Sequence, residues 1–362
     1  MITVTILTTT HASTGGVERF VSYLEKELIL HECAVTIIAK QDLRPWQQKI
    51  IGLAKYVASD QIVLGYFLGC VAMRGTSDVV ITNGLLGWNI RNKKVINVHH
   101  GTFIKGALRT RHDDVWIKYI IKRYWWSWFE QKAARGATVC AAVSEETRQS
   151  VMHYYRAKNV VTIPNAIDTD LFVPNTQEVA RKSLGLPLDK KIVFFASRLG
   201  SQKAGQLVLA IAQHIKKTRP NVIVVGAVFG QQFSQESGII GLDNGSYDRL
   251  VMAYNAADVF LLPSRHEGSS LALLESMACG LPFLASPVGL VPELLEKKLF
   301  TECIVSEPTV DAYMNHLNKL LGLSTDDQII LAQQLRTYVV EHHNLQQFGN
   351  NYFSLIKTIT SL

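Results

Sequence analysis

Hydrophobic positions in the first half of the chain alternate between two periods. Short runs rich in Val, Ile and Thr, such as ITVTILT at 2–8, have the composition of β-strands. The segment 17–28 instead repeats apolar residues at three- and four-residue intervals, the period of an amphipathic helix. The strands predicted in this half are 2–8, 34–39, 78–82, 94–99, 138–143 and 160–163. Because helical segments separate most of them, we predict a parallel sheet covered by helices on both faces.

The same alternation restarts after a connector at 163–174 that carries two prolines. The predicted strands are 191–197, 221–228, 258–263 and 282–286, with helices at about 204–217 and 247–257, after Glu267 and from about 308 onward. We therefore predict an α/β protein of two doubly wound domains, 1–168 and 169–340, with a helix in 341–362 that crosses back to the first. Ligands of such sheets bind beyond the carboxyl ends of the strands, so a cleft between the domains is the expected site.

Composition narrows the class of protein. With 48% hydrophobic and 19% charged residues, the 362-residue chain is typical of a soluble globular protein with large cores. No apolar run reaches the length of a membrane span, and the N-terminal MITVTILTTT lacks the basic region of a signal peptide. The five cysteines are odd in number and have no zinc-ligand spacing, so we expect reduced thiols in a cytoplasmic protein.

Positive charge is concentrated in one segment of the first half. Residues 1–168 hold 21 Lys and Arg against 13 Asp and Glu, and 91–135 hold 11 against three. The latter segment includes IKYIIKRYWWSWF at 117–129, where cations alternate with Trp and Tyr. One interpretation is a peripheral contact with an anionic membrane through 105–135; the other is a half-buried helix whose Trp residues fill the core. No nucleic-acid-binding module accompanies the charge, so we expect no nucleic-acid partner.

Candidate chemistry lies where predicted strands meet helices. In HASTGGVE, Gly15 and Gly16 separate the first strand from the first helix. Glycines there permit a positive φ and close backbone approach, and a helix N-terminus favours an anion. A plain turn is the alternative. SRLGSQKAG at 197–205 contains Arg198 and Lys203. One interpretation is that these two cations neutralise a diphosphate. The alternative is a solvated loop.

The segment RHEGSSLALLESMACGLP at 265–282 carries two glutamates eight residues apart. Ser269 or Ser270 is the expected N-cap of a helix that stops at CGLP. Glu267 then precedes the helix, and Glu275 is expected about two turns inside it, so that both carboxylates could face one elongated polar ligand. The backbone amides of 268–270 would offer an anion site between them. The alternative is one capping and one surface glutamate.

Histidines also follow a predicted strand, in NVHHGTF at 97–103. His99, His100 or both would point into the cleft, and His11 competes for the same role. A lone histidine at such a position is more often a structural hydrogen-bonding group than a catalytic one.

Taken in chain order, these segments resemble the retaining glycosyltransferases of the GT-B fold, in the large family 4. The most specific match is E-x7-E, from Glu267 to Glu275. Further matches are ASRLGSQKAG as the phosphate loop, VSEETRQSV at 143–151, IPNAIDTDLF at 163–172 and YNAADVFLLPS at 254–264. The resemblance covers nearly the whole chain.

The resemblance implies a role for each matching residue. Glu275 would bind the ribose of a nucleotide-sugar, Glu267 would contact sugar hydroxyls, and Arg198 and Lys203 would hold the diphosphate in place of a metal. His100 is the first choice and His99 the second for the histidine on the acceptor side. The further donor contacts would come from Gly15, Gly16, Ile240, Leu242, Gly268, Ser269, Ser270 and Leu271.

The implied reaction moves a hexose, glucose or a relative, from a UDP-sugar to a lipid-linked or polysaccharide intermediate, by a front-face mechanism without metal or cofactor. GDP-sugars stay open. Two departures bear on the sugar: Ser269-Ser270 where the family often has aromatic-Gly, and Lys203-Ala204 where it often has Lys-Gly. The alternatives are a GT-B epimerase or phosphorylase, and a non-catalytic membrane-associated binding protein.

Overall fold

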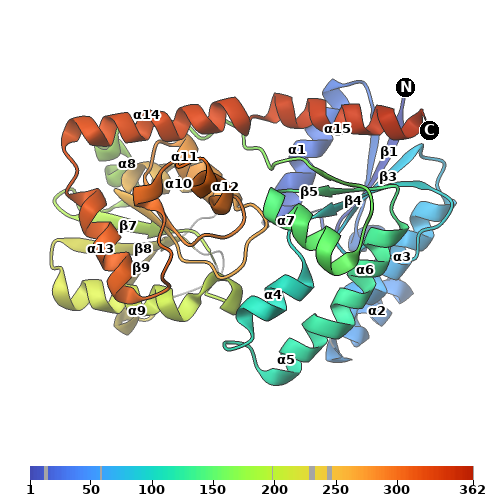
Figure 1. Ribbon diagram of the computed structural model, residues 1–362, viewed down its shortest axis with the longest axis horizontal. Coiled ribbons are helices and arrows are strands. Elements are labelled where there is room, and N and C mark those ends of the chain that lie inside the picture. The colour runs from blue at the N-terminus through green and yellow to red at the C-terminus, as the bar shows by residue number, and fades with distance from the viewer. Residues whose placement is uncertain (12–14, 58, 198, 228–232, 243–246, 362) are drawn as a thin grey trace. The chain divides into compact units, whose positions relative to one another are not determined.

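The computed structural model describes residues 1–11, 15–57, 59–197, 199–227, 233–242 and 247–361. It divides the chain into two compact units. The first comprises Met1–Ala166, Glu267–Ser269 and Leu345–Leu362, and the second comprises Ile167–His266 and Ser270–Asn344. Each unit is built on its own parallel sheet (Figure 1).

The first unit contains a six-stranded sheet of order β2-β1-β3-β4-β5-β6, parallel throughout. Its strands are β1 (Thr3–Leu7), β2 (Ala34–Ile38), β3 (Val79–Asn83), β4 (Lys94–His99), β5 (Val139–Ala142) and β6 (Val160–Thr162). All six were predicted from the sequence. Alternate residues of the central strands face opposite layers, so that Ile81 packs into one apolar cluster and Val80 into the other.

Helices cover both faces of this sheet (Figure 1). Phe20 and Leu24 of α1 and Tyr352 of α15 pack on one face, and Leu68 of α3 and Phe129 of α6 pack on the other. The helical elements are α1 (Gly16–Leu30), η1 (Lys40–Asp42), α2 (Pro45–Ala54), η2 (Lys55–Val57), α3 (Asp60–Arg74), α4 (Phe103–Thr110), α5 (Trp116–Ile120), η3 (Ile121–Trp126), α6 (Ser127–Gly136), α7 (Glu145–Ser150), η4 (Val151–Tyr155) and α15 (Leu345–Thr360). Of these, η3 and η4 are π-helical.

The second unit contains a five-stranded parallel sheet of order β11-β10-β7-β8-β9. Its strands are β7 (Lys191–Phe195), β8 (Val222–Ala227), β9 (Ile239–Leu242), β10 (Val259–Leu262) and β11 (Phe283–Ala285). The helical elements are α8 (Gln177–Leu184), η5 (Ser201–Lys203), α9 (Gly205–Thr218), η6 (Gln235–Ser237), α10 (Tyr247–Ala256), α11 (Leu271–Ala278), α12 (Val291–Glu296), η7 (Thr301–Cys303), α13 (Val310–Leu321) and α14 (Thr325–His342). The sequence predicted every strand here except β9.

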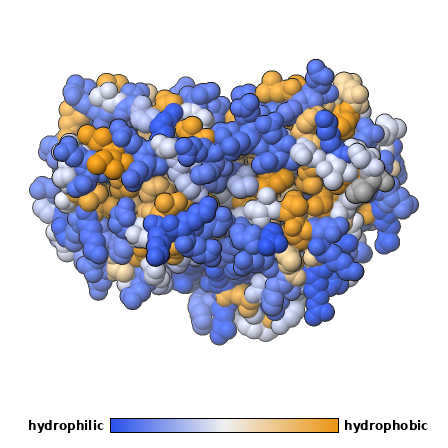
Figure 2. Space-filling view, turned by 45° about the horizontal axis from the view of Figure 1, so that its top comes forward, coloured by the Kyte–Doolittle hydropathy of each residue, from blue (hydrophilic) through white to orange (hydrophobic). Residues whose placement is uncertain are grey.

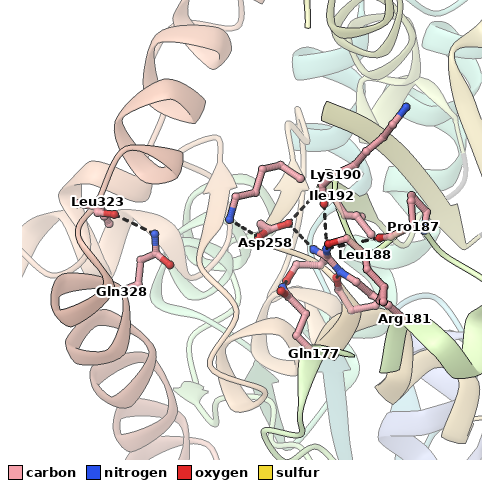
Figure 3. Close-up of polar contacts among 12 residues, drawn as sticks. Gln177, Arg181, Pro187, Leu188, Lys190, Ile192, Asp258, Leu323 and Gln328 are labelled. Carbon is pink, nitrogen blue, oxygen red and sulfur yellow. Dashed lines mark hydrogen bonds and ion pairs between the residues drawn. The ribbon is translucent and has the colours of Figure 1, made fainter. Parts of the chain in front are cut away.

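Asp258 fixes the amino-terminal edge of the second sheet (Figure 3). Its carboxylate accepts hydrogen bonds from the Ile192 backbone at 2.7 Å and from Arg181 Nη2 at 2.8 Å, and Lys191 Nζ lies 3.0 Å away. Arg181 is buried and also donates to the backbone oxygen of Ala256. These charge-assisted contacts hold the starts of β7 and β10 side by side, which aligns the loops at their opposite ends.

The remaining sequence expectations concern cysteines and membranes. All five cysteines are free thiols. Among the described residues, no helix is long and apolar enough to cross a bilayer. The face drawn in Figure 2 is mostly hydrophilic, with hydrophobic groups in small patches.

Candidate functional site

The strand order of the second unit creates a switch point between β7 and β10. The chain proceeds from β7 to β8 and β9 on one side, and then returns to place β10 on the other side of β7. The loops that leave these two neighbouring strands therefore diverge, and ligands of doubly wound sheets bind in the crevice between such loops. The first loop contains Lys203 and the second leads from Pro263 into α11.

Backbone hydrogen bonds join the two loops. The Gln202 carbonyl oxygen accepts from the amide of Arg265 at 2.8 Å and from the amide of His266 at 3.2 Å. Lys203 ends the short η5 turn, next to the residues that precede the first glutamate. The structure thus brings the predicted phosphate loop beside the E-x7-E segment. The prediction for Arg198 falls outside the described residues.

The turn between Lys203 and α9 depends on two small residues. Ala204 has a left-handed backbone, with φ 52° and ψ 46°, and its carbonyl accepts from the amides of Leu207 and Val208 at the start of the helix. Glycine is the residue that adopts this conformation most easily. At Gly205 a Cβ would lie 2.5 Å from the Leu199 carbonyl oxygen, so only glycine fits there.

Glu275 is buried inside the second unit, with 1% of its surface exposed. Its Oε2 accepts a hydrogen bond of 2.7 Å from the hydroxyl of Tyr254, a fully buried residue of α10. A carboxylate removed from water must be held by hydrogen bonds or by opposite charge. The alternative of a surface glutamate is therefore wrong for Glu275.

The helix that carries Glu275 begins and ends where the sequence predicts. It begins at Leu271, with Ser270 as the N-cap residue, and that serine makes no side-chain capping bond. Glu267 precedes the helix as predicted, but Glu275 lies little more than one turn inside α11 rather than about two. The predicted stop is confirmed: Leu281 N bonds to Ser276 O, Gly280 N bonds to Met277 O, and Gly280 has a φ of 70°.

The loop before α11 holds an unsatisfied hydroxyl. Ser269 is buried, and its Oγ has no hydrogen-bond partner among the described residues. Its carbonyl oxygen is anchored by Asn165 Nδ2 at 2.9 Å, within the first unit. In the same unit a Cβ on Gly268 would lie 2.3 Å from the His100 carbonyl oxygen, so glycine is required there. Glu267, partly exposed, precedes these residues.

The residues predicted to contact the base and sugar from other elements are placed differently. Ile240 and Leu242 lie on β9, the edge strand two positions from β7, and the Ile240 side chain is exposed. The Leu271 side chain is buried in the apolar core of the second unit, so only its backbone is available to a ligand. The sequence did not identify β9 as a strand, because IIGL is too short to give a clear period.

In the first unit, the two predicted glycines start α1 but have ordinary backbone conformations. Gly15 is the N-cap residue, with φ −115° and ψ 168°, and neither Gly15 nor Gly16 has a positive φ. The freedom of glycine to adopt a positive φ is therefore not used at these two positions. A Cβ on Gly16 would meet nothing within 4 Å, which leaves open space at the N-terminus of a 15-residue helix.

His100 follows β4 and is tied to the neighbouring strand. Its Nε2 lies 3.0 Å from Asn83 Oδ1, and Asn83 Nδ2 donates to the Leu7 carbonyl at 2.9 Å. Because that second bond fixes the amide orientation, His100 Nε2 carries the hydrogen and Nδ1 keeps its lone pair. Burial of the ring, reinforced by His99, lowers the pKa of His100 to about 3. The imidazole is therefore neutral at physiological pH.

The other two candidate histidines have structural partners. His99 is fully buried, with Nδ1 3.6 Å from Glu130 Oε1. Burial alone would lower its pKa, but Cys140 and the Glu130 carboxylate outweigh that effect and raise the pKa to about 9. His11 Nε2 lies 2.7 Å from Asp42 Oδ2 near the surface. Of the three histidines, His99 points into the core.

Sequence reasoning missed Tyr254, Asn83 and Asn165. The partners of these residues lie far away in the sequence, so no spacing pattern could reveal the contacts.

Within the described ranges, no group of three or more His, Cys, Asp or Glu side chains could hold a metal ion. A separate hollow of about 440 Å³ lies at the amino-terminal edge of the second sheet, beside Lys191 and Asp258.

Comparisons with known proteins identify both halves of the chain. The family described as Glycosyltransferase Family 4 matches residues 14–171, and the family described as Glycosyl transferases group 1 matches residues 176–338. D-inositol 3-phosphate glycosyltransferase of Mycobacterium tuberculosis is 28% identical over 193 residues, a match that covers 49% of this chain. It spans only 40% of that relative's own length.

Solved structures share the fold over the full chain. Sucrose-phosphate synthase from Thermosynechococcus elongatus has a TM-score of 0.77 at 16% identity, with 100% of both chains covered. The Anabaena protein Alr3699/HepE, solved in complex with UDP-glucose, has a TM-score of 0.69 at 16% identity over 100% of both chains. The two family matches and the two doubly wound units agree: this chain belongs to the group 1, family 4 glycosyltransferases and has the GT-B fold.

Proposed function

We propose that the protein is a retaining glycosyltransferase that moves a hexose from a UDP-sugar to a lipid-linked or polysaccharide intermediate. The observation that carries the proposal concerns the two loops at the switch point. One leads into the helix that carries the buried Glu275 carboxylate, and the other contains Lys203. A nucleotide-sugar presents a ribose diol and a diphosphate in sequence. One buried carboxylate and one cationic loop are the complementary groups for those two parts.

In this proposal Glu275 accepts hydrogen bonds from the ribose hydroxyls. The Tyr254 hydroxyl occupies one lone pair of Oε2 and orients the carboxylate from within the core. Lys203, with Arg198, lies against the diphosphate. Negative charge grows on the diphosphate as the bond to the sugar breaks, and fixed cations at that position lower the barrier.

The acceptor hydroxyl would attack from the face that the diphosphate leaves, through an oxocarbenium-like state. A phosphate oxygen of the leaving group takes the acceptor proton, and the nucleoside diphosphate departs. Neutral His100 would serve the acceptor side as a hydrogen-bonding group, because its lowered pKa keeps the ring uncharged. Glu267 and the backbone of 268–270 would contact the sugar hydroxyls.

We further propose that the reaction needs neither metal nor cofactor, since Lys203 and Arg198 supply the positive charge at the phosphates. The choice of UDP is supported by the fold shared with Alr3699/HepE, which was solved with UDP-glucose. The relative named D-inositol 3-phosphate glycosyltransferase supports sugar transfer as the class of reaction. Activity that survives EDTA is the expected result, and activity that requires added Mg²⁺ or Mn²⁺ would contradict metal independence.

A nucleotide-sugar screen by thermal shift tests the donor. Binding raises the melting temperature in proportion to the logarithm of ligand concentration over Kd. We expect UDP-hexoses to stabilise the wild type and to have little effect on Glu275→Gln. A GDP-hexose that stabilises the protein where UDP-hexoses do not would overturn the choice of nucleotide. Epimerised sugar without UDP release would instead identify an epimerase.

A further inference from the structure

Exposed aromatic side chains gather on one part of the first unit. Within the described ranges, every aromatic side chain that is exposed lies between α2 and the start of α3 or between α5 and α6; these are Trp46, Tyr56, Tyr66, Trp116, Tyr124, Trp125 and Trp128. We call these seven residues the aromatic surface. Tyr56 is 89% exposed and Trp116 72%. Soluble proteins rarely gather so many exposed aromatic rings in one place without a binding function.

Ring contacts connect four of the seven residues across the two segments. The contacts run in order through Trp46, Phe67, Tyr66, Trp88 and Phe129 to Trp125 and Trp128, with neighbouring ring centroids 4.7–5.9 Å apart. Trp125 Nε1 also donates to Ser59 Oγ at 3.3 Å, next to the η2 turn that carries Tyr56. The two segments therefore lie side by side, although about 60 residues separate them in sequence.

The helical stretch 116–136 exposes Trp125 and Trp128 and buries a lysine. Lys122 is 7% exposed and its Nζ lies 2.6 Å from Asp114 Oδ2, whereas Trp125 and Trp128 are more than half exposed. The Ser127 hydroxyl donates to the Lys122 carbonyl at 2.6 Å, across the π-helical turn η3. This arrangement reverses the usual burial of Trp and exposure of Lys. Core packing therefore describes Trp126, which packs against an apolar cluster of the first unit, but not Trp125 and Trp128.

Charge within the two segments has one sign, although Asp60, Asp113 and Asp114 flank them and Asp114 Oδ1 lies 2.9 Å from Lys118 Nζ. Neither 43–59 nor 115–129 contains an Asp or Glu. The first segment contributes the exposed residues Arg44, Lys49 and Lys55, and the second contributes Lys118. Trp and Tyr interleaved with Lys and Arg form the composition that lies at the boundary between lipid headgroups and acyl chains. The cations complement the negative surface potential of an anionic leaflet.

We propose that the aromatic surface docks the protein on a bilayer that contains anionic phospholipid, with the rings at headgroup level. A second copy of this chain fits less well, because a two-fold contact would place these cations opposite one another. A protein partner is also less favoured, since Lys is depleted at protein–protein interfaces. The proposal rests on the composition and contacts of the surface, and stands whether or not the donor and acceptor proposed above are correct.

Vesicle flotation tests the proposal with the 362-residue chain. Vesicles of phosphatidylcholine alone are compared with vesicles that also contain phosphatidylglycerol, at low and high salt. We expect the wild type to bind the anionic vesicles and to be released by salt, because screening weakens attraction to the headgroups. Quenching of Trp fluorescence by brominated acyl chains should accompany binding.

Two sets of variants separate the aromatic from the charged contribution. The Tyr56→Ser/Trp116→Ser variant should lose at least about tenfold in vesicle affinity. The Lys49→Gln/Lys55→Gln/Lys118→Gln variant should lose on the order of 100-fold on anionic vesicles. The matched control, Val179→Ser/Ile330→Ser, removes two exposed apolar side chains of the second unit, 53% and 52% exposed, and should bind like the wild type.

Three outcomes would overturn the proposal: no binding of the wild type to anionic vesicles, equal binding by the wild type and both surface variants, or a wild-type dimer that Tyr56→Ser/Trp116→Ser converts to a monomer. Thermal stabilisation by UDP-hexoses is measured on the same samples. Retained vesicle binding without any UDP-hexose response would contradict the proposed donor and leave the membrane surface supported.

Discussion

Tyr254 of α10 donates a 2.7 Å hydrogen bond to Glu275 of α11, and both side chains are buried in the second unit. No role was predicted for Tyr254, whereas Glu275 belongs to the E-x7-E motif, the most specific match in the sequence. In the proposed complex the ribose hydroxyls would contact the same carboxylate, so its orientation matters for donor affinity. Tyr254 is therefore a positioning residue for Glu275.

The Tyr254→Phe variant should bind UDP about tenfold more weakly and unfold with about 1–3 kcal/mol less free energy, because a buried acceptor loses one of its donors. Isothermal titration with UDP and denaturant unfolding measure the two effects. A double-mutant cycle with Glu275→Gln isolates the contact. If Tyr254→Phe lowers UDP affinity by the same factor in the wild type and in the Glu275→Gln variant, Tyr254 does not act through Glu275.

Gly205 and Gly200 provide a matched pair in the Lys203 loop. A Cβ at 205 would lie 2.5 Å from the Leu199 carbonyl oxygen, whereas a Cβ at 200 would meet nothing within 4 Å. We expect Gly205→Ala to displace Lys203 and lower kcat by tenfold or more, with a stability loss of about 1–3 kcal/mol. Gly200→Ala should leave both nearly unchanged. Equal effects on kcat would show that the loop geometry does not position the lysine.

Ala204 offers a stabilising change at the same turn. Its left-handed backbone costs an L-residue about 1–2 kcal/mol, and glycine removes that strain at an entropic cost of about 0.5–1 kcal/mol. Ala204→Gly should therefore raise the free energy of unfolding by up to about 1 kcal/mol, as measured by denaturant titration. A loss of stability would mean that the turn does not have this conformation.

Replacing Ser269 tests whether its buried hydroxyl contacts the sugar or contributes only to stability. Its Oγ has no partner within the described part of the chain, so Ser269→Ala should leave stability unchanged or raise it by about 1 kcal/mol. If the sugar supplies the missing partner, kcat/KM for the preferred donor should fall about 2–10-fold relative to other UDP-hexoses. Ser276→Ala is the control, because its Oγ already bonds to Leu273 O. Unaltered donor preference in Ser269→Ala would exclude this serine as a reader of the sugar.

The two adjacent histidines predict opposite pH effects on stability. The pKa of His100 falls to about 3 on folding, so the unfolded chain binds an extra proton between about 6.5 and 3 and stability is lost as pH drops through that range. The pKa of His99 rises to about 9, so the folded chain holds the extra proton and stability is lost as pH rises from about 6.5 to 9.

Thermal unfolding of the wild type and His100→Gln across pH 4–9 measures the first effect. Gln can still donate a hydrogen bond to Asn83 but does not titrate. The variant should lose less stability than the wild type below about pH 6.5 and behave similarly above it. Identical acid profiles would mean that His100 is protonated in the folded state.

Much of the fold was accessible from the sequence because its strands are short β-branched runs between amphipathic helices. β9 was not predicted, because its four residues show no clear hydrophobic period and the strand lies at the edge of the sheet. The serines at 269 and 270 and the CGLP stop predict the bounds of α11, but Glu275 lies about one turn rather than two from its start, because the helix begins only after Ser270. The backbone conformation of Gly15 could not be predicted, because glycine occurs both at a positive φ and in extended backbone.

The candidate site, too, was predictable only in part. Glu275 and Lys203 could be named from motifs, but the burial of Glu275 could not, since an isolated glutamate is usually exposed. The contacts of Tyr254, Asn83 and Asn165 depend on tertiary packing across long stretches of chain. The exposure of Trp125 and Trp128 could not be predicted either, because cations interleaved with Trp and Tyr fit both a half-buried helix and a surface helix.

The central claim is that Glu275 and Lys203 together hold a UDP-sugar for transfer. The most direct measurement is UDP release from a UDP-hexose in the presence of lipid-linked or polysaccharide acceptors, with the anomeric configuration of the product determined by NMR. We predict turnover with retained configuration, a loss of at least 100-fold in kcat for Lys203→Ala, a rise in donor KM for Glu275→Gln, and wild-type rates for the surface control Lys217→Ala. An inverted product, or a Lys203→Ala variant as active as the wild type, would contradict the account.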